Sequence, residues 1–80
     1  MPERPRSWTA NGHRYWQLRT AAAEIVASMP ESYTPYFPPK RAKYEVYTLS
    51  KNRPPRFLGY LREGPVLDRV HRVFSQTFAR

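Results

Sequence analysis

Cationic side chains are concentrated in the middle of the 80-residue chain. Residues 40–62 carry seven lysines and arginines against the single carboxylate of Glu45, and the whole chain has a formal net charge of +8. Arginine outnumbers lysine eleven to three. Its planar guanidinium can bind phosphate or carboxylate oxygens through paired hydrogen bonds and can stack on aromatic rings. The chemistry that these residues favour is therefore the binding of an anionic partner.

Tyrosines alternate with the cations in this segment, at Tyr44, Tyr47 and Tyr60. Aromatic rings beside cations are typical of surfaces on which bases stack while phosphates are neutralised. After residue 65, three more polar side chains follow at helical spacing and could add phosphate contacts. The candidate residues for binding nucleic acid or an acidic partner are Lys43, Lys51, Asn52, Arg53, Arg56, Arg62, Arg69, Arg72, Gln76, Tyr47 and Tyr60.

The residue inventory argues against an enzyme. The chain has no cysteine, and its two histidines, His13 and His71, lie far apart in the sequence. No spacing typical of a catalytic triad, a carboxylate pair, a metal site or a glycine-rich phosphate loop is present. We therefore expect a non-catalytic protein without a metal or another cofactor.

The elements that must position these residues can be predicted from the sequence pattern. Residues 1–8 read as a basic, proline-containing arm that could be flexible, and residues 9–80 as one domain. We expect a helix over residues 9–29, because Thr9 or Asn11 can cap it and Pro30 cannot continue it. The apolar side chains that fall on one stripe of this helix are Tyr15, Leu18, Ala22, Ile25, Val26 and Met29.

Prolines then dominate residues 30–42, where we expect an irregular or polyproline-like strap. The simplest role for this strap is to fold back over Trp16, a ring on a second apolar face of the expected helix. A sharper alternative is a docking face for a partner protein, built from Trp16, Tyr33, Tyr36 and Phe37.

Residues 43–62 alternate with period two on either side of a turn, which predicts a basic β-hairpin. Apolar residues at helical spacing predict a second helix over residues 65–79, opened by Pro65. The expected fold is a small α+β domain with two helices packed on a short antiparallel sheet. Since two strands alone are marginal, either the strap adds a third strand or the sheet extends in a homodimer.

These features predict a small basic protein that binds DNA or RNA through the hairpin and one face of the last helix. The alternative is a protein-interaction or inhibitor module that docks on an acidic surface. The general profile is similar to that of small accessory proteins of phages and mobile elements, which block host complexes such as a CRISPR effector or RNA polymerase. No membrane span or secretory signal is recognisable, so we expect a cytoplasmic protein.

Overall fold

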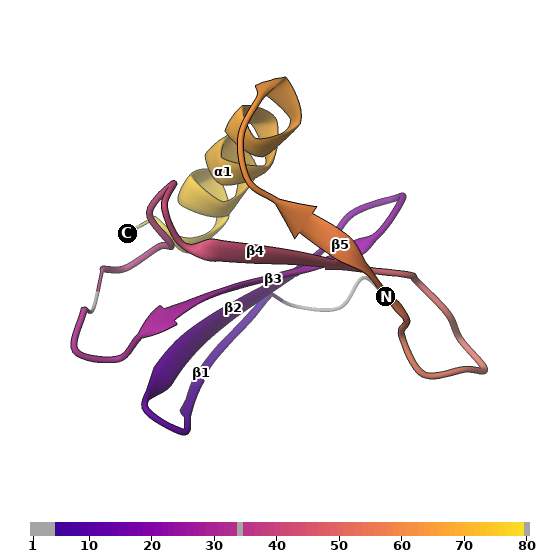
Figure 1. The fold of residues 1–80 in the computed structure, drawn as a ribbon, viewed down its shortest axis with the longest axis horizontal. Helices are drawn as coiled ribbons and strands as arrows, with labels where there is room; N and C mark the ends of the chain where they lie inside the picture. Colours follow the sequence, from indigo (N-terminus) through magenta and orange to yellow (C-terminus); the bar gives the residue numbers. More distant parts are fainter. Residues whose placement is uncertain (1–4, 34, 80) are drawn as a thin grey trace.

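A computed structural model describes residues 5–33 and 35–79 of the chain. Its five strands form one antiparallel sheet in the order of the sequence, and a single helix packs on one face of that sheet (Figure 1). The expected fold of two helices on a short sheet is therefore wrong. The elements are β1 (Arg6–Ala10), β2 (His13–Arg19), β3 (Glu24–Pro30), β4 (Lys43–Tyr47), β5 (Phe57–Leu61) and α1 (Pro65–Phe78).

The segment expected to be the first helix forms most of a three-stranded meander. Asn11 and Gly12 make the two-residue turn between β1 and β2, with φ angles of 52° and 76°. Positive φ at both positions is what a type I′ hairpin turn requires, and Asn-Gly is its preferred sequence. Asn11 therefore begins a hairpin turn and does not cap a helix.

Part of the expected N-terminal arm and both strands of the expected hairpin belong to the sheet. Of residues 1–8, the first four lie outside the described part, while Arg6 and Trp8 belong to β1. β4 and β5 lie within residues 43–62, where the hairpin is expected, and α1 ends at Phe78. The strap adds no strand to the sheet in its described part (residues 30–33 and 35–42) beyond Pro30, which ends β3. The additional strands come from the N-terminal third of the chain, so the sheet does not depend on a second copy.

The hydrophobic core lies between α1 and one face of the sheet. Directly paired residues of antiparallel strands share a face, and one cross-strand row on this face is Ser7, Trp16, Ala27, Tyr44 and Leu61. α1 packs the buried side chains of Leu67 and Phe74 against it. The rings of Phe74 and Tyr44 meet edge to face, with centroids 5.6 Å apart.

The proline-rich strap covers the end of this core. The Trp16 indole Nε1 donates a hydrogen bond to the Tyr36 carbonyl at 3.3 Å. The Tyr44 hydroxyl donates to the carbonyls of Pro38 and Pro39, at 3.3 Å and 3.1 Å. Buried polar groups need such partners, so these contacts attach the irregular strap to β2 and β4.

Alkaline pH is expected to destabilise the fold. Burial raises the pKa of the Tyr44 phenol above its ordinary value of 10. The unfolded chain therefore loses this proton first as the pH rises. The contribution of Tyr44 is complete below pH 10 and is lost as the pH rises toward the folded-state pKa, at up to about 1.4 kcal/mol per pH unit.

Urea unfolding at about pH 8 and about pH 11 measures this loss. The control is Tyr44→Phe, which removes the titrating group together with its two hydrogen bonds. It should be less stable than the wild type at the lower pH, but its stability should decline less between the two values. An equal decline in both proteins would contradict the assignment to Tyr44.

Within the part of the chain that the structure describes, no helix has the length and apolar character needed to cross a membrane.

Candidate nucleic-acid interface

The face of the sheet opposite α1 is not covered by a helix in the described part of the chain (Figure 1). We call it the open face. The strand register assigns three cross-strand rows to it. The row at the start of β4 is Trp8, Tyr15, Ser28 and Lys43; the central row is Arg6, Gln17, Val26, Glu45 and Tyr60; and the row at the end of β4 is Arg19, Glu24, Tyr47 and Phe57.

Five aromatic rings therefore share this face. The rings of Trp8 and Tyr15 are stacked, with centroids 5.3 Å apart and planes inclined by 13°. Phe57 contacts both Tyr47 and Tyr60 edge to face, at 5.6 Å and 5.0 Å. Phe57 and Tyr60 remain 45% and 42% exposed. Exposed rings on a sheet offer stacking surfaces for unpaired bases.

Trp8, Tyr15 and Phe57 were missing from the residues selected on the sequence. An N-terminal arm and the core stripe of a helix, the places expected for Trp8 and Tyr15, would not bring the two rings together. The signal that could have found Trp8 and Tyr15 is the Asn11-Gly12 turn, because a hairpin closed there pairs Trp8 directly with Tyr15.

Four cations gather where β4 begins and β5 ends. Lys40, Arg41, Lys43 and Arg62 line a basic hollow of about 450 Å³, and the Tyr60 ring forms part of its wall. Lys43 Nζ and the Arg62 guanidinium carbon lie 5.7 Å and 5.1 Å from the Tyr60 ring centroid. Lys43, Arg62 and Tyr60 were expected to act together, and the structure brings them together. Lys40 and Arg41 were not selected from the sequence.

The predicted loop residues lie at the other end of β4. Lys51, Asn52, Arg53 and Arg56 are all exposed in the connection between β4 and β5. Pro55 of the same loop lines a shallow hollow on the open face, beside Trp8 and Tyr47. Cations therefore flank the aromatic rings at both ends of β4.

The polar residues of the last helix lie on a different surface. Arg69, Arg72 and Gln76 are exposed on α1, on the side of the helix opposite Leu67 and Phe74, which face the sheet. The structure therefore does not bring them together with Lys43, Tyr47 and Tyr60.

The alternative docking face is not assembled as expected. Trp16 is 1% exposed and is a core residue of β2, so its inclusion in a partner surface is wrong. Residues two apart on a strand share a face, so Trp16 lies with Leu18 on the face of β2 that packs against α1, and the strap contacts it there. Tyr33 and Tyr36 are exposed, whereas Phe37 is half-buried and its ring contacts His71. Tyr44, expected to offer a stacking ring, is likewise in the core.

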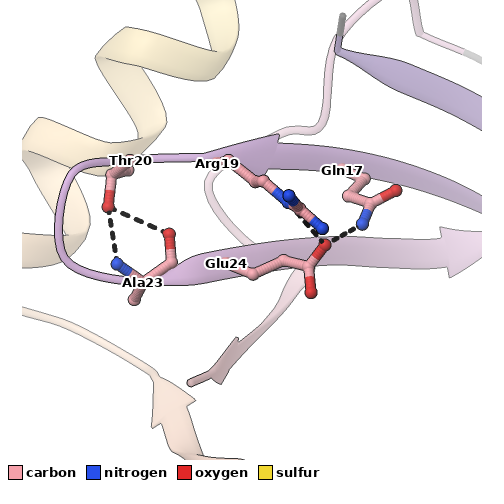
Figure 2. A network of polar contacts seen from close by, with 5 residues as sticks. All are labelled: Gln17, Arg19, Thr20, Ala23 and Glu24. Atoms are coloured by element: carbon pink, nitrogen blue, oxygen red, sulfur yellow. Dashed lines mark hydrogen bonds and ion pairs between the residues drawn. The ribbon is translucent and has the colours of Figure 1, made fainter. Parts of the chain in front are cut away.

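Two carboxylates lie among the rings of the open face. Glu24 is buried, and the side chains of Gln17 and Arg19 reach its Oε1 across the β2–β3 hairpin (Figure 2). In the adjacent turn, the Thr20 hydroxyl donates to the Ala23 carbonyl and accepts from the Ala23 amide, at 3.0 Å in each case (Figure 2). Glu24 is thus a fixed part of the hairpin.

Glu45 lies on the neighbouring strand, and its Oε2 accepts a hydrogen bond from the Tyr47 hydroxyl at 3.1 Å. Burial, followed by this hydrogen bond, raises the pKa of Tyr47. The phenol therefore remains a donor to Glu45 at neutral pH and fixes that carboxylate beside the Tyr47 ring.

Among residues 5–33 and 35–79, no three histidine or carboxylate side chains gather in a way that could hold a metal ion. Comparisons with protein-family models, with curated proteins and with solved structures find no match to this chain.

Proposed function

We propose that this protein is a non-catalytic binder of single-stranded nucleic acid and that the open face is its binding surface. The observation that carries the proposal is the placement of five aromatic rings on one uncovered sheet face, with cations at both ends of β4. Stacking on an aromatic ring contributes about 1–3 kcal/mol per base and tolerates any base, because every base has a π-face.

The charge distribution favours a single strand over a duplex. Glu24 and Glu45 lie between the rings, so phosphates laid across the middle of the open face would be repelled. The cations flank this middle region. A single strand can turn its unpaired bases toward the rings while its phosphates run past Lys43 and Arg62, whereas the bases of a duplex are already stacked on one another.

Fluorescence anisotropy with labelled oligonucleotides of about ten nucleotides tests the proposal. Oligo(dT) and single-stranded RNA should bind more tightly than a duplex of the same length. Lys40 Nζ is paired with Asp68 Oδ1 at 2.6 Å. If the other three cations of the basic hollow contact phosphates, the logarithm of the affinity should fall with the logarithm of salt concentration at a slope of roughly −2. Equal binding of the duplex and the single strands would contradict the choice of surface.

Stacking is tested separately by Tyr60→Ala. Loss of this exposed ring should weaken oligo(dT) binding about 5- to 100-fold without unfolding the protein. The matched control is Tyr36→Ala, which removes a 66% exposed tyrosine from the strap and should leave binding unchanged. Equal affinities for the two variants would exclude Tyr60 from the interface.

A further inference from the structure

The open face contains a shallow aromatic hollow of about 380 Å³, lined by Trp8, Tyr15, Glu24, Val26, Glu45, Tyr47 and Pro55. β3 contributes Glu24 and Val26 to this hollow, and the register places Val26 between Gln17 of β2 and Glu45 of β4. Tyr15 lines the hollow from β2, and Glu45 and Tyr47 line it from β4, so Val26 lies between an aromatic ring and a carboxylate. The hollow therefore has aromatic rings (Trp8 and Tyr15) on one side and carboxylates within reach (Glu24 and Glu45).

We infer that this hollow binds a guanine base of the single strand, an inference that rests on the function proposed above. The base would lie flat on Val26 with one edge against the Tyr15 ring, and the Glu45 carboxylate would accept hydrogen bonds in the plane of the base from its N1–H and N2–H groups. A carboxylate only accepts hydrogen bonds, and guanine is the base whose Watson–Crick edge presents two adjacent donors. Cytosine and adenine place an acceptor beside their amino group, and thymine or uracil flanks its one N–H with two carbonyls.

The two carboxylates of the open face differ in whether they can accept a hydrogen bond from a ligand. Glu24 is already held by Gln17 and Arg19 (Figure 2). Glu45 receives its hydrogen bond from Tyr47 at Oε2, and its Oε1 makes no hydrogen bond to the residues that the structure describes. Glu45 is thus the carboxylate that can accept from a ligand, and Tyr47 fixes its orientation.

The surroundings favour a base over a cationic side chain as the occupant. Carboxylates beside aromatic rings could also attract a lysine or arginine of a partner protein. Arg6 and Lys43, however, lie on β1 and β4 at the edges of the open face, where they would repel such a cation and attract the phosphates on either side of a base, whereas the charge of Arg19 is paired with Glu24. A neutral base is not repelled by these cations, and the phosphates of its backbone are attracted by them.

Base preference is tested with three oligonucleotides of equal length: oligo(dT), alternating dG–dT, and the same alternation with inosine in place of guanine. A lithium buffer prevents guanine quadruplexes. Inosine keeps the purine ring but lacks the N2 amino group. It therefore separates the contribution of the purine ring from that of the paired hydrogen bonds to Glu45. The guanine strand should bind roughly tenfold more tightly than oligo(dT), with inosine closer to oligo(dT).

Glu45→Gln should remove most of this preference, measured as the ratio of the guanine-strand affinity to the oligo(dT) affinity of the same variant, because the amide can no longer accept two hydrogen bonds from the base while its oxygen can still accept one from Tyr47. Glu31→Gln, the same charge change at an exposed turn residue, should keep the preference. Equal binding of the three strands, or an unchanged preference in Glu45→Gln, overturns the inference while the proposed function stands. Failure of every strand to bind overturns both.

Discussion

Replacing Lys43 and Arg62 together by glutamate is expected to weaken oligo(dT) binding about 30- to 300-fold. The slope of the logarithm of affinity against the logarithm of salt concentration should become shallower by the amount that about two phosphate contacts contribute. Both cations lie within 6 Å of the Tyr60 ring, so the reversed charges would repel phosphates beside a stacking surface. Both side chains are exposed, and the fold should lose only the two cation–π contacts, each worth about 1 kcal/mol or less.

The matched control is the double variant Arg69→Glu with Arg72→Glu. It changes the net charge by the same amount, but on the exposed side of α1, away from the open face. Affinity should fall only a few-fold through the long-range field, which salt screens. If the helix variant lost as much affinity as the strand variant, the interface would lie on α1 or binding would follow net charge alone, and either result contradicts the proposed surface.

Trp16→Ala is expected to remove about 3–5 kcal/mol from the free energy of unfolding. Trp16 is 1% exposed in the core, and its Nε1–H is bonded to the strap, so truncation leaves a cavity and removes this hydrogen bond. A domain of this length is typically stable by only about 4–12 kcal/mol. The substitution should therefore remove a large fraction of the total stability, which should appear as a markedly lower midpoint of urea unfolding.

The second tryptophan supplies the control. Trp8→Ala makes the same chemical change on the open face, where the ring stacks on Tyr15 and carries the Arg6 guanidinium at 5.3 Å. Its cost should be about 1–1.5 kcal/mol, and it should reduce oligonucleotide binding in a protein that remains folded. Urea unfolding followed by circular dichroism distinguishes the two. Equal losses of stability would contradict the assignment of Trp16 to the core and Trp8 to the surface.

The C-terminal half of the chain was predictable because its local signals agree with one another. Residues 43–47 and 57–61 alternate and are rich in aromatic and β-branched side chains, and the intervening prolines can only belong to a connection. From Pro65 onward, apolar residues follow helical spacing. No competing pattern exists there, and the strands and helix form where local preference places them.

The N-terminal third was mispredicted because two periodicities coexist in it. Leu18, Ile25 and Met29 fit a helical stripe, and Ala21–Ala23 favours a helix. Trp16 with Leu18, and Ile25 with Met29, also recur at even spacing, as one face of a sheet requires. The Asn11-Gly12 turn and the burial of β3 between two neighbouring strands decide in favour of the sheet.

The sequence by itself determined the excess of cations, its concentration in residues 40–62 and the aromatic content beside it, because these depend only on which residues are present. Tertiary structure decided which side chains share a surface. Strand register, set by the turns and by burial against α1, places Trp8 and Tyr15 beside Lys43, Glu45 and Tyr47, and sends Trp16 and Tyr44 to the core. Since adjacent residues of a strand point to opposite faces, a one-residue change of register would exchange the two sets, and only the pairing of all five strands determines which set meets the solvent.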